Sequence, residues 1–135
     1  MVTIAIMGIA FVAILTGVAI AISASDSHRQ EATAEGIVRS FAERIIDPKD
    51  TPYVPCASVG DYQNPSGFEL PVGWSASVTS VAYLQPGEPP QAYGGGCPSP
   101  DLGAQQLTLR VASPQGRHAA TETLVAVKRA RTLAS

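Results

Sequence analysis

The residue types that most often carry chemistry are scarce in this sequence of 135 residues. Cys56 and Cys97 are its only cysteines, and His28 and His118 are its only histidines. An even number of cysteines favours a disulfide, which would stabilise the fold by about 4 kcal/mol in the chain-entropy model. Two free thiols are the alternative. A zinc site needs more cysteine or histidine ligands at suitable spacing than these four residues offer, so we expect no bound metal.

The sequence also lacks the arrangements typical of catalysis. It contains no Ser/His/Asp pattern, no HExxH motif and no pair of carboxylates suited to acid–base work. The glycine run at residues 94–96 is not followed by the Lys-Ser/Thr of a phosphate-binding loop. We expect His28 and His118 to be exposed, and Trp74 and Tyr83 to belong to the core. The chain is therefore expected not to be an enzyme and to need no cofactor.

Charge is low and unevenly distributed along the chain. Charged residues make up 15% of the sequence and the net charge is -2, which argues against a nucleic-acid-binding surface. The first charged side chain is Asp26, and all of the charge follows it. The chain thus divides into an uncharged amino-terminal segment and a remainder with the composition of a small globular domain.

The segment from Met1 to Ile22 is apolar except for Thr3 and Thr16. As a helix it would be about 33 Å long, which matches the hydrocarbon core of a bilayer. We therefore expect residues 1–25 to form a transmembrane or filament-core helix. A secretory signal peptide is the alternative, because residues 19–21 form an A-x-A site. No basic segment precedes the apolar run, however, and the run is longer than a signal peptide requires.

Residues 26–47 are expected to continue the same helix in amphipathic form. This segment is rich in helix-forming residues and has no proline before Pro48. Its apolar residues recur at spacings of three and four, which places them on one helical face that must pack against another element. The expected result is one continuous helix, about 70 Å long, that ends near residue 46. The residues expected to pack on a sheet are Ala34, Ile37, Val38, Phe41 and Ile45.

Residues 48–135 have the pattern of a small β-sheet domain. Proline and glycine mark residues 48–73 and 85–102 as loops, each with one of the cysteines. A Ser-Pro-Gln-Gly turn at residues 113–116 joins two strands into a hairpin. The fold class is therefore α+β, with an antiparallel sheet of three or more strands against the helix. The expected strands are residues 74–84, 105–112 and 121–128, and the cluster of Lys128, Arg129 and Arg131 is expected to be a polar tail.

The order of an apolar helix, an amphipathic helix and a small antiparallel sheet resembles type IV pilins and the pseudopilins of type II secretion. Residues 4–9 (IAIMGI) are similar to the IAIIGI-like end of the family's amino-terminal signature. Residues 103–128 resemble the carboxy-terminal pattern of actinobacterial minor-pilin-like proteins. In this family a basic leader and a glycine precede the processing site, and a glutamate follows the methylated first residue. Met1 falls inside the matching helix, so no processing residue is carried over.

Three explanations are open for that difference: a start assigned too late, a trimmed chain, or a protein that is not processed in this way. The resemblance implies a single-pass membrane protein with residues 48–135 outside the cytoplasm, which assembles into a pilus-like filament or a secretion pseudopilus. Its implied partners are membrane lipid, other pilin-like subunits and the assembly machinery, and no nucleic acid is expected. A small secreted or surface β-domain, released from a signal peptide as a binding module, is the alternative. The helix residues implied in membrane anchoring and assembly are Ile4, Ile6, Gly8, Ile9, Phe11, Val12, Leu15, Gly17 and Val18.

Overall fold

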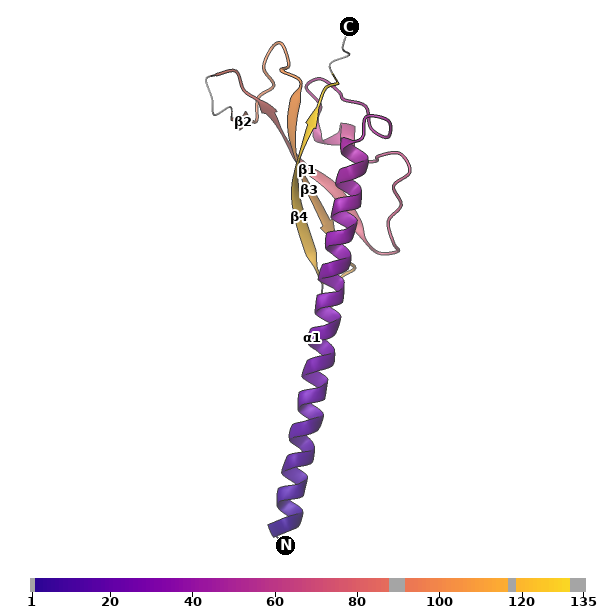
Figure 1. The fold of residues 1–135 in the computed structure, drawn as a ribbon, viewed down its shortest axis with the longest axis vertical. Helices are drawn as coiled ribbons and strands as arrows, with labels where there is room; N and C mark the ends of the chain where they lie inside the picture. The colour runs from indigo at the N-terminus through magenta and orange to yellow at the C-terminus, as the bar shows by residue number, and fades with distance from the viewer. Residues whose placement is uncertain (1, 88–91, 117–118, 132–135) are drawn as a thin grey trace.

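A single long helix dominates the computed structural model. The structure describes residues 2–87, 92–116 and 119–131. Within the helix it describes the side chains of residue 12 and of residues 14 onward. Helix α1 (Val2–Ile46) has 45 residues and is about 68 Å long (Figure 1). The predicted continuous helix and its end at residue 46 are confirmed. Predictions for the side chains of Ile4, Ile6, Ile9 and Phe11, for the surroundings of Gly8 and for His118 lie outside the described residues.

Helix α1 is continuous because nothing in its sequence interrupts backbone hydrogen bonding. Thr16 and Thr33 turn their hydroxyl groups back onto the helix, where each donates to the carbonyl four residues earlier at 2.8 Å. On the solvent side of the second half, Arg39 donates to the Glu35 carboxylate one turn earlier. The helix ends before Pro48, which has no amide hydrogen to continue it.

Four antiparallel strands form one sheet in the order β2-β1-β3-β4. They are β1 (Ser75–Leu84), β2 (Tyr93–Gly94), β3 (Ala104–Ala112) and β4 (Thr121–Arg129). The three predicted strands are confirmed to within one residue at each end. Strand β2 was not predicted, since its two residues fall in the proline- and glycine-rich segment expected to be a loop. One 3-10 turn, η1 (Val59–Tyr62), lies in the long connection between α1 and β1.

The second half of α1 packs on one face of the sheet, mainly against β4 and β3 (Figure 1). Four of the five residues predicted to face the sheet are fully buried, and Ile37 packs at the edge of the core. Phe41 contacts Phe68 with ring centroids 4.9 Å apart. Alternate residues of β3 complete the core. The fold is therefore α+β, with a long helix on an antiparallel sheet, as the sequence predicted. The buried residues shared by helix and sheet include Ala34, Val38, Phe41, Ile45, Leu107, Leu109 and Val111.

Candidate functional site

The first half of α1 extends away from the sheet domain, and no strand of the described residues lies beside it (Figure 1). Every described side chain from residue 12 to residue 26 is exposed. We call its described apolar part, residues 12–22, the apolar half. Val12 is 63% exposed, Ile14 64% and Ile20 65%, and a Cβ placed on Gly17 would meet nothing within 4 Å. The large apolar side chains exposed there are Val12, Ile14, Leu15, Val18, Ile20 and Ile22.

Exposure of these six side chains to water is costly. Full burial of such a side chain is worth about 1.5–3 kcal/mol, so covering six that are roughly 60% exposed is worth about 5–11 kcal/mol. That amount is comparable with the whole stability of a small domain. An exposed apolar patch of this kind marks a surface that contacts a partner or a lipid phase. In the described part of the chain, no helical stretch meets the length and apolarity required to cross a membrane.

Lys128 fixes the other end of α1 to the sheet. It was expected in a polar tail, and this expectation is wrong: Lys128 is only 1% exposed, and its Nζ donates to the carbonyls of Ile45 and Thr51, the latter at 2.7 Å. The ammonium also lies 5.6 Å from the centre of the Tyr62 ring. Lys128 occupies an inward-facing position of β4 and supplies a donor to the Ile45 carbonyl in the last turn of the helix, which no later residue of the helix can reach.

Side chains around the helix end complete this network. The Thr51 hydroxyl donates to the Arg44 carbonyl at 3.1 Å, and the Thr51 amide donates to the Asp47 carbonyl at 2.9 Å. Arg44 and Asp50 form an ion pair at 2.9 Å. Burial lowers the pKa of the Lys128 ammonium, and the nearby Asp47 carboxylate opposes that shift only in part. The end of α1 is thus held by backbone and side-chain contacts from both its own connection and β4.

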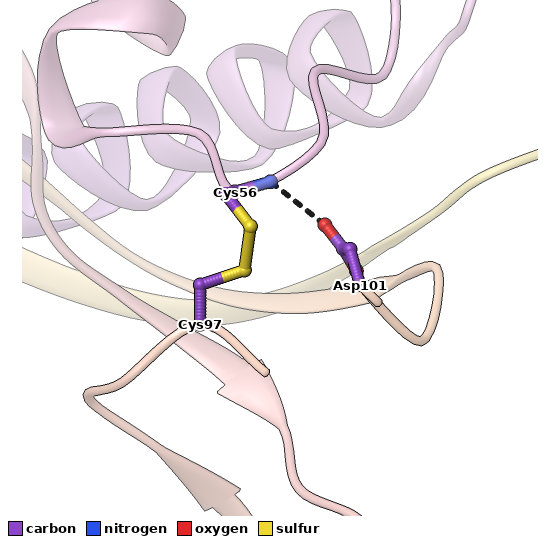
Figure 2. A group of neighbouring side chains, drawn as sticks. All are labelled: Cys56, Cys97 and Asp101. Carbon is purple, nitrogen blue, oxygen red and sulfur yellow. Dashed lines mark hydrogen bonds between the residues drawn. A yellow bond between two sulfur atoms is a disulfide. The ribbon is translucent and has the colours of Figure 1, made fainter. Parts of the chain in front are cut away.

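A disulfide between Cys56 and Cys97 ties the connection after α1 to the segment between β2 and β3 (Figure 2). The predicted disulfide is confirmed, with Cα atoms 5.5 Å apart and a sequence separation of 41. Cys56 has a backbone φ of 52°, a left-handed conformation that is unfavourable for a residue with a Cβ. Cys56 is held in this conformation by the disulfide and by the hydrogen bond from its amide to Asp101.

Asp101 is the polar centre of this region and receives hydrogen bonds from two segments of the chain. Its carboxylate accepts from the Cys56 amide at 2.7 Å (Figure 2). It also accepts from the Gly103 amide at 2.8 Å and from the Tyr53 hydroxyl at 2.9 Å. Burial works against ionisation of Asp101, but the hydrogen bonds outweigh it and hold the pKa of this carboxyl below its usual value. Burial and the neighbouring Asp101 raise the pKa of Tyr53. The arrangement positions the two loops rather than presenting a reactive group.

Cys56, Cys97 and Asp101 also lie close enough together to be considered as metal ligands, with their ligand atoms within 4.8 Å of one another. Both sulfur atoms are joined in the disulfide, however, and a metal binds cysteine as the thiolate. In this oxidised form the group offers one carboxylate, which is already occupied by hydrogen bonds.

A buried polar contact joins the connection after α1 to the sheet. Gln105 of β3 is fully buried, its Nε2 donates to the Val54 carbonyl at 2.8 Å, and its Oε1 accepts from the Tyr62 hydroxyl at 2.9 Å. The Tyr62 hydroxyl in turn accepts from the Val54 amide at 3.1 Å. Sequence reasoning missed both residues. Gln105 faces the same side of β3 as Leu107, and this alternation was the one sequence signal for its burial. Nothing in the local sequence marks Tyr62 as its partner.

The remaining residues singled out from the sequence have ordinary environments. His28 is exposed and its Nδ1 lies 3.6 Å from Glu31. Tyr83 is half-buried and donates to the Ala57 carbonyl at 2.7 Å, while Trp74 packs at the edge of the core. Gly94 belongs to β2. Comparisons of this chain with family models, with curated proteins and with solved structures find no match.

Proposed function

We propose that this chain is a structural subunit of the pilin or pseudopilin type. It is held in a membrane by α1 and then assembles through α1 into a type IV pilus-like filament or a secretion pseudopilus. The observation that carries the proposal is the contrast within one helix: one face of the second half is buried on a sheet, whereas the side chains of the apolar half are exposed in the part of the chain that the structure describes. A helix of this kind needs an apolar partner outside its own domain.

Two environments in turn supply that partner. Before assembly, lipid covers the apolar half, which continues an uncharged sequence that begins at Met1. In a filament, neighbouring copies of the same helix replace the lipid, so the helix leaves the bilayer without exposing its side chains to water. The proposed partners are thus membrane lipid, other pilin-like subunits and the machinery that assembles them, and the proposed role is structural rather than enzymatic.

The disulfide supports a location for the domain outside the cytoplasm. Disulfides persist in oxidising compartments and are rare where thiol reductants are abundant. The Cys56–Cys97 bond closes the two longest connections of the domain against each other. The proposal therefore places the sheet domain on the outer side of the membrane, and on the filament surface after assembly.

A charge in the apolar half tests membrane anchoring. Val12→Asp places a carboxylate where lipid is proposed, which costs about 3–4 kcal/mol and lowers the membrane partition ratio by roughly 100- to 1,000-fold. Val72→Asp is the matched control, because Val72 is 99% exposed in a loop of the domain. Flotation of the full chain with vesicles measures both. Equal flotation of the two variants, or a wild-type chain that stays in the aqueous fraction, would contradict the proposal.

Assembly through the helix has its own test. With Leu15→Cys, oxidation is expected to link copies of the chain along α1 in assembled material, whereas Val72→Cys on the exposed loop is expected to stay unlinked. The native amino terminus, measured by mass spectrometry, separates this proposal from its alternative. A terminus between Ala21 and Ser25 would identify a cleaved signal peptide and a secreted binding module, and the subunit proposal would be abandoned.

A further inference from the structure

Three side chains that could hold a metal ion meet where the connection after α1 lies against the segment between β2 and β3 (Figure 2). The sulfur atoms of Cys56 and Cys97 and a carboxylate oxygen of Asp101 lie within 4.8 Å of one another. In the oxidised chain the disulfide occupies both sulfur atoms. Reduction changes what this group can bind, because a thiol becomes a thiolate ligand once a metal displaces its proton.

The backbone separation of the two cysteines suits a metal ion as well as a disulfide. Their Cα atoms are 5.5 Å apart. Two thiolates on a tetrahedral zinc ion, with Zn–S bonds of about 2.3 Å, stand roughly 3.8 Å from each other. Each sulfur is carried on one rotatable Cα–Cβ bond, so side-chain rotation can open the pair to this spacing while the backbone stays in place.

Hydrogen bonds that do not involve sulfur hold both segments beside the end of β1. The Tyr83 hydroxyl donates to the Ala57 carbonyl at 2.7 Å, one residue after the first cysteine. Gln85 Nε2 donates to the Gly96 carbonyl at 2.8 Å, one residue before the second cysteine. Reduction leaves these contacts chemically unchanged. The two thiols are therefore expected to stay neighbours, as a preformed pair of ligands.

Asp101 is oriented in the way that a metal-binding carboxylate is oriented. Such carboxylates accept outer-shell hydrogen bonds that fix their direction. Asp101 accepts from the amides of Cys56 at 2.7 Å and Gly103 at 2.8 Å. The Tyr53 hydroxyl lies 2.9 Å from one carboxylate oxygen and 3.0 Å from the other, so it can remain on one oxygen while the other binds a metal.

The ligand types indicate which metal would bind. Thiolates select thiophilic ions, and zinc accepts a carboxylate beside them, whereas copper(I) takes soft ligands. Cys56 is exposed, which gives an ion a way in and lets water fill a fourth position. We propose that reduction of the Cys56–Cys97 disulfide creates a Zn²⁺ site made of two thiolates, the Asp101 carboxylate and water, and that oxidation expels the ion. This inference does not depend on the proposed assembly of the chain.

The redox step balances with a dithiol or a phosphine as the reductant. A dithiol passes two electrons and two protons to the sulfur atoms, the S–S bond breaks, and the dithiol becomes a disulfide. A phosphine supplies the two electrons, takes the oxygen of one water molecule and becomes a phosphine oxide, while the protons of that water go to the sulfur atoms. Zn²⁺ then displaces both thiol protons to solvent.

Zinc binding to the full chain in detergent micelles tests the proposal. The chain is reduced with a phosphine, desalted without oxygen, checked for folding by circular dichroism, and titrated with Zn²⁺ against a chromophoric chelator. The reduced wild type is expected to bind zinc and the oxidised chain is not. Asp101→Asn is expected to weaken binding about 100-fold, because even an outer-shell partner is worth 10–100-fold. Asp26→Asn, the same change at an exposed position of α1, is expected to have no effect.

X-ray absorption at the zinc edge identifies the ligands without any substitution. Two sulfur atoms at about 2.3 Å and oxygen atoms at about 2.0–2.2 Å are expected. A reduced chain that does not bind zinc, equal binding by the oxidised chain, or equal affinity of a folded Asp101→Asn variant would overturn the site. Four sulfur neighbours would also overturn it, since zinc would then bridge two chains. If Asp101→Asn does not fold, the number of sulfur neighbours and the release of zinc on reoxidation decide the question.

Discussion

Replacement of Lys128 by methionine tests whether the end of α1 is held as the structure shows. The variant keeps the aliphatic length of the side chain but removes both hydrogen bonds, to the Ile45 and Thr51 carbonyls. These carbonyls lie in a buried setting, so each unpaired group costs about 1–3 kcal/mol, while relief of the buried charge returns part of that amount. We expect a net loss of about 3 kcal/mol, which for a domain of this size lowers the Tm by about 12–24 °C.

The chain supplies a matched control, because Lys49 and Lys128 are its only lysines. Lys49 is exposed just beyond the helix, and Lys49→Met is expected to change the free energy of unfolding by less than about 0.5 kcal/mol. Thermal and urea unfolding measure both variants. If Lys128→Met is as stable as the wild type, the buried carbonyls are satisfied in another way and the described role of Lys128 is wrong.

The pH dependence of stability gives an independent check with a defined sign. Burial lowers the pKa of Lys128 in the folded protein, so the unfolded chain binds this proton more tightly than the folded one. Stability contributed by Lys128 therefore rises as the pH increases from its folded pKa towards the ordinary value of 10.5. The difference in stability between wild type and Lys128→Met is expected to grow over this interval. A difference that shrinks would contradict the sign of the shift.

Three further predictions concern the disulfide region and the core. Replacement of Cys56 and Cys97 together by serine is expected to lower the free energy of unfolding, measured in urea, by about 4 kcal/mol. Reduction of the wild type is expected to lower its stability to that of the variant. Equal stability of the oxidised and reduced wild type would refute a stabilising disulfide. Because the pKa of Asp101 is lowered in the fold, its contribution is present at neutral pH and is lost as the pH falls through that lowered value, so Asp101→Asn is expected to flatten the acid limb of the stability profile. Phe41→Ala is expected to cost about 3–5 kcal/mol, whereas Ala32→Gly on the exposed side of α1 costs about 1 kcal/mol.

The sequence was sufficient for the elements whose signal is local. The helix was predictable because apolar residues recur at helical spacing and Pro48 ends the pattern. Strands β3 and β4 were predictable from alternation and from the turn between them. Strand β2 was missed because its two residues join the sheet through backbone pairing with Tyr83 and Leu84, and no side-chain pattern records such pairing.

The candidate site was predictable only in part. The apolar half of α1 and the cysteine pair follow from residue types alone. The contacts of Asp101 do not, since its partners Tyr53 and Cys56 lie 48 and 45 residues away in the sequence. Hydrogen bonds across such separations depend on how the loops are brought together by the sheet and the disulfide. No periodicity in either loop encodes them.

Lys128 shows how residue type and residue position compete in such predictions. Lys128 lies two residues after Ala126 in β4 and so faces the same, inward side of the sheet. Alternation alone would have placed it in the core. Its charge favoured the surface, because an unpaired buried ammonium is costly. The deciding fact is the partner, namely the Ile45 carbonyl at the end of α1, 83 residues away, which no strand pattern can reveal.

The two ends of α1 differ in what they leave unsatisfied, and this difference accounts for their different partners. At the carboxy-terminal end the sheet-facing side chains are buried, and donors from within the chain satisfy the last carbonyls: Lys128 Nζ for Ile45 and the Thr51 hydroxyl for Arg44. In the apolar half the helix satisfies its own backbone, and what is left over is apolar side-chain surface. No point contact can cover such a surface, because the hydrophobic effect scales with area. An extended apolar environment, such as lipid or a bundle of like helices, is the kind of partner that can.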